Sequence, residues 1–426
     1  MNEHRITPNI LMFAPSCYPP GNPEAFVNAN LVLAALEAGW GVDVITMADS
    51  GHWYPNTGEA WRRLASCVVT VAERERTLAN RFLVAARSFM LSGQRVSGGH
   101  WAIPAAKEAM RLTSKKNYDY IVSRALPPEA HLSALIVSRK TGIPWIANWN
   151  DPVPWEKFPR QYPGGKGKHA PLGYFTARYY REVAKQALWH TFPCERLRAY
   201  IAGYLPGDIR DKSSVVPHIA LDRRNPAVRS NEGFTLMHAG SLRSPRSPDV
   251  FLKGVRLFRE RANPGREFSV VFIVDRPEDV RRSAGEHGLE ALVRIEKSRP
   301  YTEMPEVLRS ATVLVIIEAL VEEGIFLPSK FADYVGVGRP ILAISPRTGT
   351  LSDVLGEHGG GIAVDGGSAE AVAHALHVLY EHWLNNTLDE HYNTSNLYGL
   401  FAVDTVLDVY REIFDRITPP SPQSSP

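Results

Sequence analysis

Cysteine is scarce in this sequence of 426 residues, which contains only three, and they lie far apart. They form neither a CxxC pair nor a Cys/His spacing typical of zinc, so we expect no disulfide framework and no structural zinc. Long apolar runs are missing too, since no stretch approaches the roughly 18 residues that a membrane-spanning helix needs. The first residues carry both charge signs and do not resemble a signal peptide. We therefore expect a cytoplasmic protein with reduced cysteines.

Two familiar motifs are also absent. The turn after the first predicted strand, residues 10–13, lacks G-x-G-x-x-G, which counts against a dehydrogenase. No Asp-x-Asp pair occurs in the chain, so we expect no sugar-nucleotide site that chelates a metal through such a pair. We expect neither a metal nor a bound cofactor. Arginine, lysine and helix dipoles would then have to neutralise any diphosphate.

Charge is unevenly distributed along the chain. Residues 1–200 contain 24 Lys and Arg against 15 Asp and Glu, a net charge of +9, whereas the whole chain carries only +3. A basic half favours an anionic partner for that half. No nucleic-acid-binding motif accompanies the charge, so we expect no nucleic acid, and an anionic membrane surface is the favoured partner.

Residues 76–91, RTLANRFLVAARSFML, carry apolar side chains at helical spacing with arginines among them. A basic amphipathic helix of this kind can lie in a membrane interface, on the inner face of the membrane for a cytoplasmic protein. The alternative interpretation is a helix packed on the sheet with its arginines in solvent.

The stretch with the densest pattern is residues 322–342, EEGIFLPSKFADYVGVGRPIL. It follows a β-branched apolar run, residues 313–317, that is typical of a buried parallel strand. A helical register then begins after Pro328, and residues 341–344 form another strand. This order predicts a βαβ unit whose loop lies at the carboxyl edge of the sheet, where open α/β sheets bind their ligands.

The first turns of that helix carry the relevant chemistry. Ser329 and Lys330 offer a hydroxyl and a cation beside free backbone N–H groups, and Pro328 sets the turn. Asp333, one turn later, can accept hydrogen bonds from a pair of sugar hydroxyls. The combination fits a nucleoside diphosphate. An ordinary βαβ unit without a ligand is the alternative.

A second loop with anion-binding character follows the predicted strand 234–239. Gly240 permits close backbone approach, and Ser241, Arg243 and Arg246 lie beside the start of the next helix. The alternative interpretation is that these arginines are ordinary solvated loop charges.

The first half supplies candidates for the opposite wall of a cleft. Gly21 and Asn22 lie in the turn-rich loop after the first strand. His131 follows the predicted strand 118–123, and Asp151 follows the strand 143–148. His131 and Asp151 both lie at a strand end or helix start, where ligands bind. Either of these two could equally cap a helix or satisfy a buried neighbour.

The strand–helix alternation predicts an α/β protein with two Rossmann-like parallel-sheet domains facing across a cleft. The expected boundaries are residues 1–222 for an acceptor-binding domain and 223–400 for a donor-binding domain, joined by a polar linker at 223–233. A helix at 401–417 is expected to pack back on the N-terminal domain, and residues 418–426 are expected to be disordered.

Three segments resemble the retaining family-4 glycosyltransferases of the GT-B fold: PSKFADYVGVGRPIL at 328–342, GSLRSPRSP at 240–248 and VVPHIALD at 215–222. The resemblance covers nearly the whole chain. It implies that Asp333 holds the nucleotide ribose and that Arg246 and Lys330 stabilise the diphosphate during catalysis. His131 is our candidate for contacting the donor sugar from the N-terminal domain, and Asp151 is our candidate for the acceptor side. One departure is Ile325, which stands where the family has a second glutamate.

The resemblance implies a hexosyltransferase that moves a sugar from a nucleoside-diphosphate sugar to a hydroxyl acceptor with retention. A cell-surface polysaccharide or lipid-linked glycan pathway is favoured, and glycan, lipid-linked and small-molecule acceptors all remain open. Two alternatives also remain open. A sugar-nucleotide epimerase of the same fold would need no acceptor, and a non-catalytic binding protein would account for the isoleucine at 325.

Overall fold

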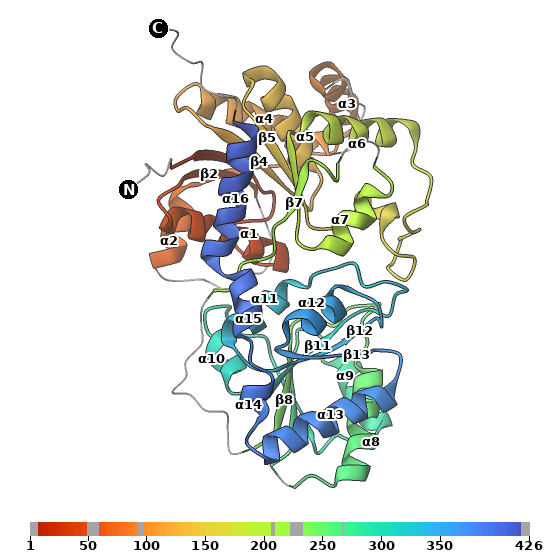
Figure 1. Ribbon diagram of the computed structural model, residues 1–426. Helices are drawn as coiled ribbons and strands as arrows, with labels where there is room; N and C mark the ends of the chain where they lie inside the picture. The colour runs from red at the N-terminus through yellow and green to blue at the C-terminus, as the bar shows by residue number, and fades with distance from the viewer. Residues whose placement is uncertain are drawn as a thin grey trace.

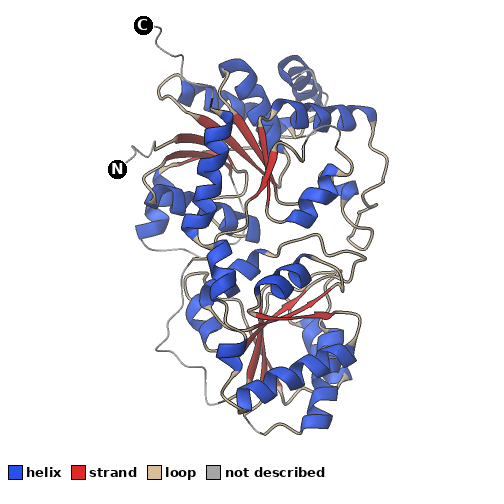
Figure 2. Ribbon diagram, viewed as in Figure 1, coloured by secondary structure: helices blue, strands red, loops and turns tan. Residues whose placement is uncertain are grey.

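The computed structural model describes residues 7–48, 59–92, 98–205, 209–221, 233–265 and 267–418. Two α/β domains are stacked one above the other, each with a central sheet between layers of helices (Figures 1 and 2). All strand pairs in both sheets are parallel. The predicted fold class is confirmed. The expected linker at 223–233 and the tail at 418–426 lie almost entirely outside the described residues.

The N-terminal sheet has seven strands in the order β3-β2-β1-β4-β5-β6-β7. Side chains alternate across it, so that Ile10 and Met12 enter one hydrophobic cluster while Leu11 and Phe13 enter the other. The strands are β1 (Asn9–Phe13), β2 (Gly41–Met47), β3 (Val68–Val71), β4 (Tyr120–Ala125), β5 (Trp145–Trp149), β6 (Trp189–Phe192) and β7 (Ser213–Val215).

Helices cover both faces of this sheet. Those of the N-terminal domain are α1 (Pro23–Glu37), α2 (Glu59–Ser66), α3 (Leu78–Ser92), α4 (Gly99–Thr113), α5 (Glu129–Thr141), the 3-10 turn η1 (Trp155–Lys157), α6 (Tyr174–Gln186) and α7 (Glu195–Ala202). Among the described residues, no helix is long and apolar enough to cross a membrane.

The C-terminal sheet has six strands in the order β10-β9-β8-β11-β12-β13. The chain reverses direction across the sheet between β8 and β11, which creates a crevice at their carboxyl ends. The strands are β8 (Thr235–Ala239), β9 (Ser269–Ile273), β10 (Val293–Glu296), β11 (Val313–Ile317), β12 (Ile341–Ser345) and β13 (Gly361–Asp365).

In the C-terminal half, helices alternate with strands as far as the helix that ends at Leu384, after which the chain returns to the N-terminal domain. They are α8 (Asp249–Ala262), α9 (Glu278–Glu286), α10 (Met304–Arg309), α11 (Ser329–Val337), α12 (Thr350–His358), α13 (Ala369–Leu384), α14 (Leu388–His391), α15 (Ser395–Phe401) and α16 (Val403–Ile417). The last of these lies across the N-terminal domain, beside α1 (Figure 1). Its Phe414 ring stacks on Tyr120 of β4 at 4.1 Å between centroids.

The two domains also contact each other directly. Arg196 of α7 forms ion pairs with Glu323 and Asp353 of the C-terminal domain, with N–O distances of 2.7 and 2.5 Å. Phe158, which follows η1, lies 5.7 Å from Phe326 between ring centroids. These contacts form one side of the interdomain boundary.

Candidate active site

A cavity of about 650 Å³ lies between the two domains. The C-terminal domain contributes the loop after β8, the residues after β9 and β11, and the first turns of α11. The N-terminal domain contributes the loop 20–23 and the inner side of α1. The carboxyl ends of β8 and β11 meet here, which is the expected ligand site of an open α/β sheet.

Arg246 enters this cavity from the β8–α8 loop. Its Nε donates to Glu318 Oε1 at 3.2 Å, and Glu318 directly follows β11. Glu318 raises the pKa of the Arg246 guanidinium above its usual value, so Arg246 stays positively charged. The carboxylate holds the guanidinium at the cavity wall.

Lys330, in the first turn of α11, lies over Gly240. A Cβ at Gly240 would approach Lys330 Nζ to 2.9 Å, a contact that the flexible lysine could relieve, whereas the backbone φ of +114° at this position favours glycine. Lys330 Nζ lies 3.4 Å from His238 Nε2. Burial, reinforced by the charge of Arg246, lowers the pKa of the Lys330 ammonium to about 8. Two cations therefore share one cavity, which favours an anionic ligand.

The start of α11 faces the same space. Pro328, Ser329 and Lys330 all line the cavity. No side chain caps the helix at Pro328, and the Phe331 N–H bonds to the Pro328 carbonyl at 2.9 Å, so the N–H groups of Ser329 and Lys330 are the ones available to a ligand.

Asp333 lies one turn along α11 and also lines the cavity. Its Oδ1 accepts a hydrogen bond of 2.6 Å from Tyr301 Oη. Tyr301 Oη in turn accepts from Asn30 Nδ2 of α1 at 3.1 Å. The carboxylate is thus linked to the opposite domain.

The remaining residues of the predicted donor loop lie nearby. Gly240, Ser241 and Arg243 line the cavity. Arg243 Nε donates to Ser241 Oγ at 3.1 Å, and its guanidinium pairs with Asp275 at 3.2 Å.

Comparison with known proteins identifies the fold. Residues 233–382, which include most of the donor side, match the family described as "Glycosyl transferases group 1". The full chain superimposes on a glycosyltransferase from Rickettsia africae with a TM-score of 0.68 and 13% identity, covering 97% of this chain and 100% of the other. The fold is GT-B.

Further solved structures with this fold are similar at the same low identity. Anabaena Alr3699/HepE in complex with UDP and glucose gives a TM-score of 0.66 at 13% identity, covering 96% of this chain and all of that one. Sucrose-phosphate synthase from Thermosynechococcus elongatus gives 0.63 at 13% identity, with the same coverage. No curated protein matches the chain in sequence.

On the N-terminal side of the GT-B cleft, Gly21 and Asn22 line the cavity as the sequence suggested. Asn22 also caps α1, since its Oδ1 accepts from the backbone N–H of Ala25 at 2.9 Å. Asn22 therefore lines the cavity and caps the helix at the same time.

His131 is not brought to the cavity, and its predicted contact with the donor sugar has no support in this geometry. The side chain is fully buried beneath Trp149, with ring centroids 4.4 Å apart, and its Nδ1 lies 2.8 Å from Ser123 Oγ. Burial lowers the pKa of the imidazole to about 3, so it is neutral. His131 is buried because it is the third residue of α5 and lies on the face of the helix that packs against the sheet.

Asp151 does not line the cavity either, but it lies close enough to Glu24 and Arg246 to interact with their charges. Burial and the nearby carboxylate of Glu24 raise its pKa to about 8, while Arg246 opposes that shift. Burial likewise raises the pKa of Glu24, whose Oε1 accepts from Asn150 Nδ2 at 2.7 Å. These two acidic groups lie on the N-terminal side of Arg246.

Glu318 and Tyr301 are among the cavity residues that we did not predict from the sequence. Glu318 was identifiable in principle, because a carboxylate directly after a buried parallel strand falls at the ligand edge. Tyr301 carries no local signal, since its loop position depends on how the two domains meet. Ile325, which stands where a glutamate was expected, is fully buried and its carbonyl accepts from Cys194 Sγ at 3.2 Å.

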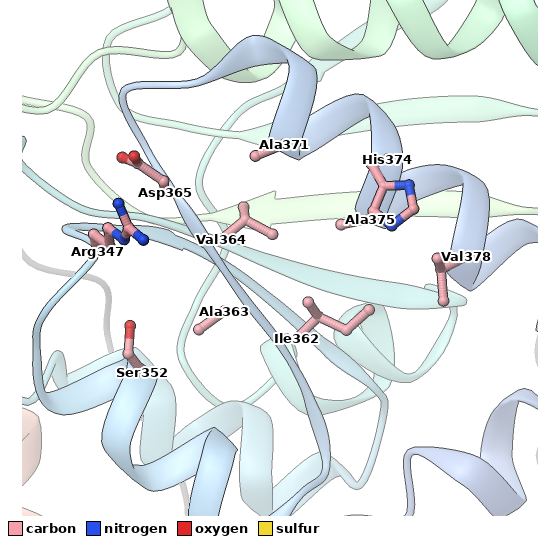
Figure 3. A pocket seen from close by; sticks show the side chains of 10 residues that line it. All are labelled: Arg347, Ser352, Ile362, Ala363, Val364, Asp365, Ala371, His374, Ala375 and Val378. Atoms are coloured by element: carbon pink, nitrogen blue, oxygen red, sulfur yellow. The ribbon is translucent and has the colours of Figure 1, made fainter.

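A second groove of about 400 Å³ lies at the β13 edge of the C-terminal sheet, between α12 and α13 (Figure 3). Arg347, Asp365 and His374 are its charged or titratable lining residues. None of the predicted site residues lines this groove, and only one domain forms it. It is not the candidate active site.

Proposed function

We propose that this protein transfers a sugar from a nucleoside-diphosphate sugar to a hydroxyl acceptor with retention of anomeric configuration. The observation that carries the proposal is the convergence of Arg246, from the β8–α8 loop, and Lys330, from the first turn of α11, in one interdomain cavity. Their mutual repulsion is relieved when a diphosphate lies between them. Asp333, one helical turn further along, is placed to accept hydrogen bonds from the ribose.

The chemical difficulty is the negative charge that develops on the β-phosphate as the glycosidic bond breaks. Arg246, Lys330 and the free N–H groups of Ser329 and Lys330 would stabilise that charge from fixed positions. Pro328 has no N–H and supplies only the geometry of the turn. The departing phosphate would take the acceptor proton, so the mechanism needs no histidine base and does not depend on His131.

The ligands bound in structures of similar proteins support the donor class. The Anabaena structures contain UDP with glucose and UDP-glucose, and the Staphylococcus aureus MnaA structure contains UDP. The proposed donor for this chain is therefore a nucleoside-diphosphate sugar. The reaction as proposed requires no metal ion, because Arg246 and Lys330 supply the positive charge.

The acceptor side is proposed from charge. The basic N-terminal half favours an acceptor in a polysaccharide or lipid-linked glycan pathway, at the cytoplasmic face of a membrane. Glycan, lipid-linked and small hydroxyl acceptors are all candidates for the assay.

Release of nucleoside diphosphate from UDP-, GDP-, ADP- and dTDP-sugars, with and without an acceptor panel, tests the proposal. We expect release from one donor class that accelerates with an acceptor, gives an α-linked product from an α-linked donor, and persists in EDTA. Conversion of the sugar nucleotide without an acceptor would indicate an epimerase. Binding without turnover for every acceptor would indicate a binding protein.

A further inference from the structure

Helix α3 presents an apolar face to solvent on the N-terminal domain. Its exposed large apolar side chains, with exposed fractions, are Leu78 (74%), Phe82 (80%), Leu83 (42%), Phe89 (54%) and Met90 (74%). Twelve such side chains occur among the described residues, so five of them gather on this one helix of 15 residues. A concentration of this kind marks an interaction surface rather than scattered surface residues.

The opposite face of α3 fixes the orientation of the helix. Val84 and Ser88 are buried, and a Cβ on Gly99 would approach Val84 Cγ1 to 2.7 Å, which shows how closely α3 packs on α4. Leu78, Phe82 and Phe89 follow a helical spacing of four and seven residues, so they share the outward face. The interpretation of this segment as a helix packed on the sheet therefore does not account for these three exposed side chains.

The charges on α3 are positive. Arg81 and Arg87 are its only charged side chains, and neither has an ion-pair partner among the described residues. At about 100° per residue, Arg81 and Arg87 flank the apolar face on its two sides. The helix lies at the end of the N-terminal domain remote from the C-terminal domain (Figure 1), in the half of the chain with the positive excess.

We propose that α3 docks the protein on an anionic lipid bilayer, with the apolar face in the interfacial region and the arginines at the lipid phosphates. The apolar face would contact the acyl-chain boundary of the bilayer, and the flanking arginines would contact the anionic headgroups above it. A second copy of this chain is a poorer fit, because a two-fold pairing of α3 would bring like charges together with no acidic side chain in the helix to pair them. This proposal does not depend on the proposed function.

Co-sedimentation with vesicles tests it. The probes are vesicles of phosphatidylcholine alone and vesicles of equal parts phosphatidylcholine and phosphatidylglycerol. We expect the full chain to bind the anionic vesicles at least about tenfold more strongly and to detach as salt is raised. Phe82→Ser with Met90→Ser, and separately Arg81→Gln with Arg87→Gln, should each lower binding by about tenfold or more.

The matched control is Leu384→Ser on α13, an exposed leucine of the other domain, which should bind vesicles as the parent does. Thermal unfolding of every variant checks that the fold is intact, since all the altered side chains are exposed except the partly buried Arg87. Absence of binding to anionic vesicles, or binding unaffected by the two α3 double variants, would overturn the proposal. A dimer that the Phe82→Ser, Met90→Ser variant dissociates, without vesicle binding, would assign the face to a second copy instead.

Discussion

Tyr301 Oη donates a 2.6 Å hydrogen bond to Asp333 Oδ1, the carboxylate to which we assign the ribose. The tyrosine ring also stacks on Phe26 of α1, with centroids 4.1 Å apart. The bond from Asn30 Nδ2 to the same hydroxyl extends the connection into the N-terminal domain. The carboxylate that we propose for the ribose therefore already has a hydrogen-bond partner within the protein.

The first prediction concerns that competition. Tyr301→Phe removes the hydroxyl but keeps the ring, so a nucleoside diphosphate should bind more tightly, by up to about tenfold for one hydrogen bond to a charged group. Isothermal titration measures the dissociation constant. A 2′,3′-dideoxynucleoside diphosphate is the control ligand, and its affinity should gain less because it lacks the ribose hydroxyls. Weaker binding of the ordinary nucleotide would show that Tyr301 instead positions Asp333 for the ligand.

A second prediction concerns Arg246. Arg246→Ala should lower kcat by about two to three orders of magnitude, because it removes a fixed cation from the leaving phosphate. Arg256→Ala is the matched control, since Arg256 forms an ordinary i,i+4 ion pair with Glu260 on α8. That control should leave kcat unchanged. An Arg246→Ala enzyme that retains parental turnover would remove this residue from the mechanism.

The third prediction follows from the pKa of Lys330, which burial and Arg246 lower to about 8. Below that value the ammonium attracts a diphosphate, and above it the amine is neutral. Affinity for the nucleotide should therefore fall as pH rises through about 8, by at most about tenfold per unit. Lys330→Gln should bind more weakly and show no such fall. Equal pH profiles for parent and variant would contradict the assignment.

The lowered pKa of Lys330 has the opposite pH dependence in the stability of the ligand-free protein: nucleotide affinity should fall with rising pH, whereas stability should rise. Between about 8 and the ordinary value of 10.5, the unfolded chain binds the Lys330 proton more strongly than the folded protein does. Since stability rises with pH wherever the unfolded state holds more protons, this group should contribute increasing stability across that window. Comparing parent and Lys330→Gln in urea isolates the contribution.

A fourth prediction concerns α16. Phe414 is buried, stacks on Tyr120 and lies 5.5 Å from Trp40 between ring centroids. Phe414→Ala should lower the free energy of unfolding by about 3–5 kcal/mol, because it leaves a cavity in the N-terminal domain. Urea denaturation measures the change, and Leu384→Ala, at the exposed last residue of α13, should change it by less than about 0.5 kcal/mol. A small effect of Phe414→Ala would mean that α16 is only loosely attached.

The donor side of the site was predictable because its signals are local. Residues 328–342 combine a strand, a helix start and three polar side chains within a few residues, so periodicity and position placed Ser329, Lys330 and Asp333 together. The loop 240–248 was identifiable in the same way. The structure places all of these around one cavity.

Residues whose positions depend on tertiary packing were not predicted correctly from the sequence. His131 follows a strand, as ligand-binding residues do, but its position on α5 directs its side chain into the core. Helix α4 was missed in the stretch 51–118, because its alanines are buried on several sides and Pro104 interrupts the pattern. The position of the Tyr301 side chain in the cavity depends on how the two domains pack together, and no local sequence pattern predicts that packing.

The central claim is that the interdomain cavity binds a nucleoside diphosphate through Asp333, Lys330 and Arg246. The most direct test is thermal unfolding of the parent and of Asp333→Ala with UDP, GDP, ADP and dTDP. At about 100 times its dissociation constant, the correct nucleotide should stabilise the parent by about 2.7 kcal/mol, and Asp333→Ala should lose most of that gain. Stabilisation of neither protein by any nucleotide, or equal stabilisation of both, would contradict the account.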